Sequence, residues 1–217
     1  MSKIYDDNHL KMQLEFESEK LASAVENIIV HEEVMDDEKA FIESRDMFFL
    51  STIDAEGKPT VSYKGGDAGF IRVVDAKTLA FPSYDGNGMF LSMGNIAGNK
   101  SVGILFIDFE NPHRLRLQGE ASVDKNDPLM SEYKEADMIV RVSVSKLWKN
   151  CPRYIHKYVK EKDSGYVPRE NCETPMPPWK KLEDIQEILP SKDQGKAIQQ
   201  GGTITIEELV EIEARED

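Results

Sequence analysis

Cysteine is scarce in this chain of 217 residues, which holds only Cys151 and Cys172. Two cysteines are too few for a disulfide framework, and no CxxC motif or Cys/His cluster suggests a metal site. No apolar run approaches the length of a membrane span, and the first seven residues lack the apolar core of a signal peptide. We therefore expect no metal, no membrane association and residence in the cytoplasm.

Basic residues are also in deficit, because 27 Lys and Arg against 40 Asp and Glu give a net charge of -13. The deficit lies at the two ends: residues 1–48 hold thirteen acidic and five basic side chains, and residues 181–217 hold ten and four. The middle, 49–180, is nearly neutral with seventeen and eighteen. Acidic ends repel nucleic acid over long range but leave the middle free to bind a small anion. We predict no nucleic-acid partner.

The spacing of apolar residues divides the chain into three expected regions. Residues 1–46 form an N-terminal extension, with one helix over roughly 17–31 and a short helix after Asp36. Residues 47–160 form the main β domain. Residues 161–217 form a linker followed by acidic helices over 182–189 and 206–214.

Short apolar runs separated by turn residues predict the strands of the main domain, at 47–53, 58–64, 70–74, 78–81, 101–108, 113–123 and 137–145. Only the connection around 86–99 has room for a crossover helix, and a further helix is expected over 150–160. Because most connections are tight turns, the fold class is mainly β (α+β), an antiparallel barrel with flanking helices and not a doubly wound sheet.

A row of polar residues follows the second predicted strand. Thr60, Ser62 and Lys64 recur at every second position, so two hydroxyls and a cation share one strand face just before Gly65 and Gly66. A lone lysine at this place would read as a charged strand end before a turn. The row of three favours contact with a phosphate.

The second polar stretch is Gly86-Asn87-Gly88-Met89, which we expect to open the crossover helix. Amides at a helix start attract phosphate, although Asp85-Gly86 is also an ordinary turn signal. The glycine spacing is not a dinucleotide fingerprint, because Leu91 occupies the place of the third glycine.

In order and spacing, the stretch from Phe41 to Val123 resembles the pyridoxamine 5'-phosphate oxidase-like flavoproteins. The matching pieces are 48–52, 57–59, the strand ending in Lys64, 81–83, 86–88, 94–96, 102–107 and 119–121. The resemblance implies a split barrel of the FMN-binding type, a homodimer, and FMN between the two subunits. The FMN-binding residues that it implies are Thr60, Val61, Ser62, Lys64, Phe81, Ser83, Asn87, Gly88 and Met89.

The chain departs from that family in two places. Many members carry Arg or Lys where this chain has Gly88 or Met89, which leaves Lys64 and backbone amides to hold the phosphate. True pyridoxamine phosphate oxidases end in a basic segment that holds substrate, whereas this chain ends Glu211-Ile212-Glu213-Ala214-Arg215-Glu216-Asp217. Oxidation of a B6 vitamer is therefore not expected.

The segment from Asn150 to Lys157 is the other chemically rich stretch, and one branch of the family carries a similar segment after its last strand. Arg153, His156 and Lys157 are candidates for an anionic substrate or a nicotinamide cofactor. The alternative is a surface amphipathic helix with a buried cysteine, because no base, nucleophile and orienting group occur together. No catalytic residue is assigned.

The sequence thus predicts an FMN-dependent oxidoreductase in which hydride passes through flavin N5, with NAD(P)H or another small molecule as donor. One alternative is a flavin-binding protein without turnover, serving storage, sensing or stress protection. Another is a split barrel that binds deazaflavin or haem.

Overall fold

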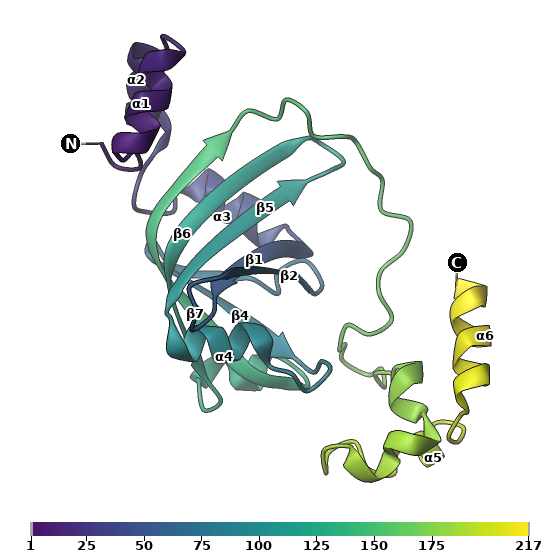
Figure 1. The fold of residues 1–217 in the computed structure, drawn as a ribbon. Coiled ribbons are helices and arrows are strands. Elements are labelled where there is room, and N and C mark those ends of the chain that lie inside the picture. The colour runs from purple at the N-terminus through teal and green to yellow at the C-terminus, as the bar shows by residue number, and fades with distance from the viewer. Residues whose placement is uncertain (1, 217) are drawn as a thin grey trace. The chain divides into compact units, whose positions relative to one another are not determined.

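The computed structural model describes residues 2–216 and divides into two compact units, Met1–Glu161 and Lys162–Asp217. The first unit is built on one curled antiparallel sheet (Figure 1). Residues 1–46 lie within this first unit. In the part of the chain that the structure describes, no helix combines the length and the apolar character that crossing a bilayer requires.

Seven strands form the sheet in the order β2-β1-β5-β6-β7-β4-β3, and every pairing is antiparallel. The strands are β1 Met47–Ile53, β2 Pro59–Gly65, β3 Arg72–Asp75, β4 Thr78–Tyr84, β5 Ser101–Asp108, β6 His113–Asp124 and β7 Ala136–Asn150. The antiparallel β architecture predicted from the sequence is confirmed.

Alternation of apolar and polar side chains builds the core of the sheet. In β1, Phe48 and Leu50 are fully buried while their neighbours are only half-buried. The Phe48 ring contacts three other rings, with centroids 5.8 Å from Phe70, 4.9 Å from Phe81 and 5.6 Å from Phe106. Such aromatic contacts stabilise beyond the area that they bury.

Four α-helices accompany the sheet: α1 Asp7–Glu15, α2 Glu19–Ile29, α3 Asp36–Glu43 and α4 Leu91–Gly98. The prediction missed α1, where apolar residues at alternate positions hid a helix that Asp6 caps through the amides of Asn8 and His9. The crossover helix was expected to open at Asn87-Gly88-Met89. It begins at Leu91, and the three residues lie in the loop before it.

The helix predicted over 150–160 is wrong. Instead, β7 continues as far as Asn150, beyond the predicted end of the strand at 145, and the chain then runs on without regular structure. Pro152 disfavours helical geometry at Cys151, so the chain is not favoured to turn into a helix directly after β7. Leu147, which lies beyond the predicted strand, is fully buried and pairs with Leu117 of β6, so burial extends the strand.

The second unit consists of short helices: the 3-10 helices η2 Pro178–Lys181 and η3 Glu183–Ile188, then α5 Lys196–Gln199 and α6 Ile206–Glu216. The first unit adds a 3-10 helix, η1 Pro128–Glu132. In the second unit the acidic helix predicted over 182–189 is a 3-10 helix, and the one predicted over 206–214 is α6.

Candidate functional site

The polar row on β2 lies on the inner face of an edge strand. Thr60, Ser62 and Lys64 are half-buried, whereas Val61 and Tyr63 between them are 69% and 63% exposed. This is the alternation that a strand with one covered face requires. The three polar side chains therefore share a face, as their spacing predicts, and Val61 points away from it.

Helix α4 covers part of this row and is joined to it through side chains. The hydroxyl of Ser62 lies 2.8 Å from that of Ser92. Asn95 donates from Nδ2 to the hydroxyls of Thr52 at 3.0 Å and Thr60 at 3.3 Å, and these two hydroxyls lie 2.9 Å apart. The strand and the helix are thus held in a fixed relation by a buried polar network.

Ser92 and Asn95 were not among the predicted site residues. They stand three positions apart on α4, so both reach the same side of the helix. This spacing was visible in the sequence, but a serine and an asparagine three apart are common. Only the long-range approach of α4 to β1 and β2, seen in these hydrogen bonds, gives the pair a role.

Lys64 differs from the other two members of the row, because its amine has no hydrogen-bond or ion-pair partner in the range 2–216. It is half-buried, and burial lowers the pKa of the amine below its ordinary value. It stands opposite Phe48 in the register of β1 and β2. A partly desolvated amine without a counter-ion is a favourable place for an anion.

The residues predicted on the other side of the site are spread over β4 and the loop that follows it. Phe81 is 1% exposed and packs on Phe48, so only its backbone could face a ligand. Ser83 is half-buried near the end of β4. Asn87, Gly88 and Met89 are exposed, and the side-chain oxygen of Asn87 accepts the Met89 N–H at 3.1 Å.

The backbone of this loop has two unusual positions. Gly88 has φ +78° and the cap residue Phe90 has φ 49°, a left-handed conformation that is uncommon for a phenylalanine. Strained turns of this kind cluster where a chain is shaped for binding. Met89, Phe90 and Leu91 are each at least half exposed, so apolar side chains line this loop.

Tyr84, the last residue of β4, brings a hydroxyl to the start of the same loop. Burial is the main reason that its pKa is raised to about 12, and the neighbouring Tyr133 and Asp67 add to the effect. The hydroxyl therefore remains protonated at physiological pH and is available as a hydrogen-bond donor. Sequence reasoning did not select this tyrosine, because nothing in the local pattern marked its burial.

The third predicted group makes no hydrogen bond or ion pair with the row in the part of the chain that the structure describes. Arg153, His156 and Lys157 are exposed, and among the described residues no hydrogen bond or ion pair joins them to β2 or α4. The structure therefore brings together Thr60, Ser62 and the residues of α4, with Lys64 on the same strand face.

The model of the pyridoxamine 5'-phosphate oxidase family matches residues 34–152, more than half of the chain. The chain belongs to this family. The match includes the whole seven-stranded sheet, and the split-barrel class expected from the resemblance is confirmed. It ends two residues after β7, so the second unit lies outside the matched part.

Solved structures give further likenesses at low identity. HupZ of Group A Streptococcus is 18% identical, with 54% of this chain and 93% of that chain covered and a TM-score of 0.44. HutZ, a heme storage protein of Vibrio cholerae, is 19% identical over 54% and 94%, with a TM-score of 0.40. An FMN-binding protein of Syntrophomonas wolfei is 10% identical over 64% and 97%, with a TM-score of 0.42. Among curated proteins, none matches.

Proposed function

We propose that the protein is a cytoplasmic, homodimeric, FMN-dependent oxidoreductase. The observation that carries the proposal is the half-buried amine of Lys64, which has no partner among residues 2–216 and stands in one row with Ser62 and Thr60. Membership of a family named after a flavin-dependent oxidase supports the same cofactor. The row fits the phosphate end of FMN, because a fixed cation beside hydroxyls suits a phosphoryl group.

The chain's own residues would bind and orient the cofactor. Lys64 balances the phosphate charge, and Ser62 is held for a ribityl or phosphate oxygen by its contact with Ser92. The loop 85–90 supplies Asn87 and the backbone of Gly88, and its exposed apolar side chains exclude water from one side of a flat ring. When bound, FMN supplies two-electron hydride chemistry at N5.

A second copy of the chain is part of the proposal. The outer face of β2 exposes Val61 and Tyr63, and the loop exposes Met89 and Phe90. Exposed apolar groups on an edge strand and a neighbouring loop favour burial in a subunit interface. The sequence also predicted Arg153, His156 and Lys157 as contacts for an anionic substrate or a nicotinamide donor, which stays a prediction and is not part of this proposal.

The second candidate is a flavin-binding protein that does not turn over. One observation favours it: the side chains joined at the row are hydroxyls, an amide and one amine, without a carboxylate or imidazole to move a proton. Hydride transfer needs no such group on the protein if the substrate carries the proton itself, so the oxidoreductase remains the first candidate.

The test is the visible spectrum of the protein after saturation with FMN and gel filtration, before and after anaerobic NADPH. The proposal expects a retained flavin spectrum that NADPH bleaches. Retained flavin that bleaches with neither NADPH nor NADH favours the binding protein. Loss of flavin on the column would overturn both, and a Soret band after haem addition would then identify the alternative ligand.

A further inference from the structure

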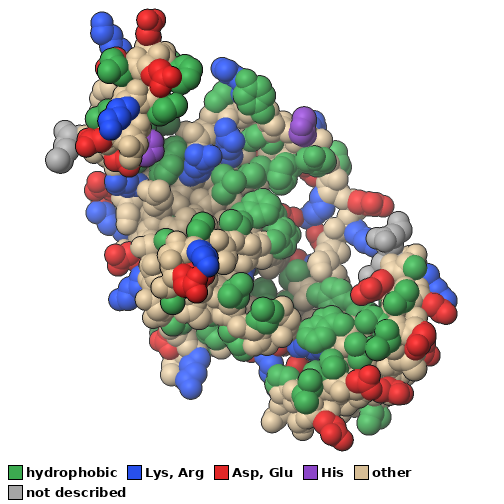
Figure 2. Space-filling view, in the orientation of Figure 1, with side chains coloured by type: hydrophobic (Ala, Val, Ile, Leu, Met, Phe, Trp, Pro, Cys, Tyr) green, Lys and Arg blue, Asp and Glu red, His purple; other side chains and the backbone are tan. Residues whose placement is uncertain are grey.

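The turn between α1 and α2 exposes apolar and acidic side chains in alternation. Leu14, Phe16 and Leu21 are 63%, 69% and 67% exposed. Between them stand Glu15, Glu17 and Glu19, whose side chains are exposed and whose carboxylates have no hydrogen-bond or ion-pair partner within the described chain. We call residues 14–21 the hairpin tip. In Figure 2 hydrophobic and acidic side chains are mixed on the surface of the N-terminal helices.

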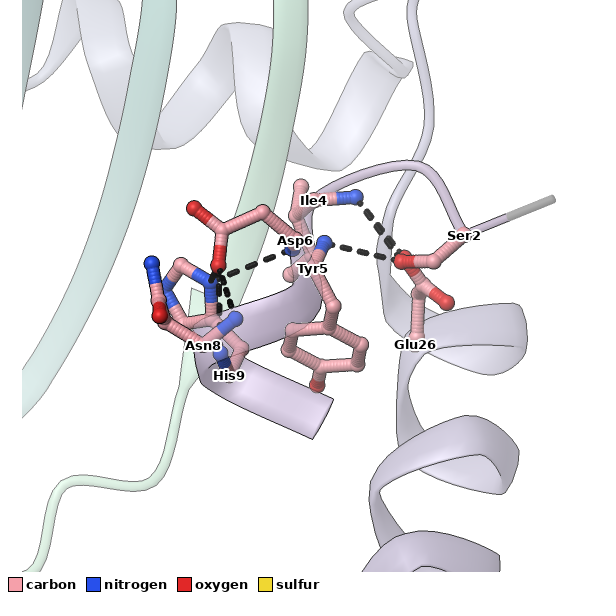
Figure 3. Close-up of polar contacts among 7 residues, drawn as sticks. All are labelled: Ser2, Ile4, Tyr5, Asp6, Asn8, His9 and Glu26. Carbon is pink, nitrogen blue, oxygen red and sulfur yellow. Dashed lines mark hydrogen bonds and ion pairs between the residues drawn. The ribbon is translucent and has the colours of Figure 1, made fainter. Parts of the chain in front are cut away.

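The hairpin of α1 and α2 is firmly held at its base, which we define as residues 2–4 and Glu26. The exposed tip is therefore not part of a loose chain end. The Glu26 carboxylate accepts hydrogen bonds from the Ser2 hydroxyl at 2.6 Å and the N–H groups of Lys3 at 2.6 Å and Ile4 at 2.9 Å. Figure 3 shows Ser2 and Ile4 gathered at Glu26. Burial alone would raise the pKa of this carboxyl, but the hydrogen bonds outweigh it and lower the pKa.

The base is also joined to the sheet. Lys146 of β7 donates to the carbonyl of Lys3, and His31 exchanges backbone hydrogen bonds with Leu147 at 3.2 and 2.9 Å. The hairpin is thus fixed at its base and carries apolar side chains at a tip that nothing covers within residues 2–216. Exposed apolar groups on a fixed element indicate a surface that becomes buried in an assembly.

A surface of opposite charge follows β7. Residues 151–159, which we call the strap, carry Arg153, His156 and Lys157, exposed and without a partner among the described residues. Tyr154 is 88% exposed and Val159 is 75% exposed. The strap is held at its far end, where the Tyr158 N–H donates to the Phe109 carbonyl at 3.1 Å and the two rings lie 5.5 Å apart.

We propose that the hairpin tip of one copy of the chain docks on the strap of a second copy. Both elements mix charged with apolar side chains, and their net charges have opposite signs, since the tip carries three carboxylates and Lys20 and the strap carries Arg153 and Lys157. Around a two-fold axis the contact forms twice, since each copy carries one tip and one strap. Phe16 and Leu14 would cover Tyr154 and Val159, with the charges around them.

Helix electrostatics favour the cationic strap of a second copy as the partner of the tip, over an anionic partner. Glu15 ends α1, whose last turn holds no basic residue, so its carboxylate lies at the negative end of the helix dipole. A cationic partner relieves this repulsion. An anionic bilayer would increase it, and so would residues 162–217, which hold thirteen acidic against seven basic side chains. Lys11 and Lys20 reduce the negative charge of the hairpin without reversing it.

Cross-linking between two distinguishable chains tests the contact directly. One tagged chain carries Phe16→Cys with Cys151→Ser and Cys172→Ser, and the co-expressed second chain carries Cys172→Ser and keeps the native Cys151 of the strap. We expect a short bismaleimide to join the two chains at several times the yield of a control with Lys125→Cys in place of Phe16→Cys. Equal yields overturn the proposal. A second outcome would also overturn it. If one chain carries both Phe16→Cys and Cys151, and the link forms within that chain in a dilute sample but not between chains, the tip and the strap meet within one copy.

Charge exchange gives an independent test. The tip variant E15K/E17K/E19K and the strap variant R153E/K157E should each weaken the dimer about tenfold, because like charges then face each other in both contacts. Mixed in equal amounts they should restore it, since both contacts of the mixed dimer pair opposite charges. The matched control E187K/E207K/E213K changes charge equally in the second unit and should leave the dissociation constant unchanged.

Sedimentation equilibrium at low and high salt provides the measurement for these variants. An unchanged dissociation constant in the tip and strap variants, or a mixture no tighter than either variant alone, rules the docking out. The inference does not depend on FMN. At protein concentrations well above the dissociation constant the tip variants are still dimeric and should retain the cofactor on gel filtration, so failure of the flavin proposal and failure of the docking proposal give different results.

Discussion

The two compact units of the chain hold their interiors in opposite ways. The first unit buries a continuous apolar core in which the Phe48 ring contacts three other aromatic rings. Among its described residues, the apolar side chains that the second buries are Met176, Leu189 and Ala197, with Ile185 packed partly against them. A unit of this size buries too little apolar surface to be stable on that account alone. Its interior therefore depends more on polar contacts than the interior of the first unit does.

The main polar contact of the second unit is a buried ion pair. Lys180 Nζ lies 2.8 Å from Asp193 Oδ2, and both side chains are 5% exposed. Asp193 also accepts from Lys196 at 3.3 Å, and Gln186 donates to the Lys180 carbonyl at 2.9 Å. Removing one member of a buried pair leaves the other charged and desolvated, which costs more than the pair itself contributes.

The largest effect is expected in the apolar core. Phe48→Ala should lower the free energy of unfolding of the first unit by about 3–5 kcal/mol, since it removes three ring contacts and leaves a cavity. Urea unfolding followed by circular dichroism measures the loss. The same substitution at the exposed Phe16 is the control and should cost little. Similar losses in the two variants would contradict the picture of a core centred on Phe48.

The matching change in the second unit acts through charge. Asp193→Ala should lower the free energy of unfolding of the second unit by about 3 kcal/mol or more, because the buried Lys180 ammonium loses the carboxylate that lies 2.8 Å from it. Hydrogen exchange should show lost protection over residues 176–204 while the strands stay protected. The double variant Lys180→Met/Asp193→Leu removes both charges and should recover most of the protection. Equal loss in the strands would show that the units do not unfold separately.

The sequence was informative where a pattern repeats locally. Short apolar runs bounded by turn residues located all seven strands, and only the end of β7 was missed by more than a few residues. The sequence was not informative where packing decides. Alternating apolar residues at 10–16 belong to a helix whose apolar side chains remain exposed, and the continuation of β7 to Asn150 depends on the burial of Leu147 against β6. Neither fact can be read from the segment alone.

The candidate site was predictable to a similar degree. Thr60, Ser62 and Lys64 were found because strand geometry fixes which side chains share a face. Ser92 and Asn95 were missed because their role depends on hydrogen bonds to Ser62 and Thr60, which are at least thirty residues away in the sequence. The loop residues Asn87 to Met89 were expected at a helix start, but the left-handed Phe90 delays the helix to Leu91.

Lowering the pH should weaken an ion pair in the first unit. In the first unit, Arg141 donates to Asp127 at 2.5 and 3.0 Å, and this hydrogen bonding is the main reason that the pKa of Asp127 is lowered. A lowered folded-state pKa gives stability that is present above the ordinary pKa of about 4 and is lost as the pH falls through the folded value. Asp127→Asn should cost about 1–3 kcal/mol at pH 7.

The same variant should show a smaller drop in melting temperature than the wild type between pH 7 and pH 3, because the group that titrates is gone. Asp7→Asn, at an exposed carboxylate without a partner in the described chain, is the control and should leave the acid response unchanged. An Asp127→Asn protein as acid-sensitive as the wild type would assign the response to other carboxylates.

The smallest effect on stability is expected at Lys64, and this effect is the most informative for function. Here the first unit half-buries an amine instead of an apolar group. Burial lowers the pKa of this amine, so the charged form is disfavoured in the folded state. The sign follows from linkage: stability rises as the pH rises through the folded pKa toward the ordinary value, and near neutrality the charge is a cost. Lys64→Met removes that cost and keeps the length of the side chain. We therefore expect an unfolding midpoint equal to or slightly above that of the wild type at pH 7, together with FMN affinity about tenfold weaker or more, from the loss of a charge-assisted contact.

Lys58→Met, just before the same strand, is the matched control and should change neither quantity. If Lys64→Met instead lowers stability and leaves FMN affinity unchanged, the amine has a structural role and the phosphate must bind elsewhere. The opposite signs of the two expected effects are what separate a binding residue from a core residue at this position.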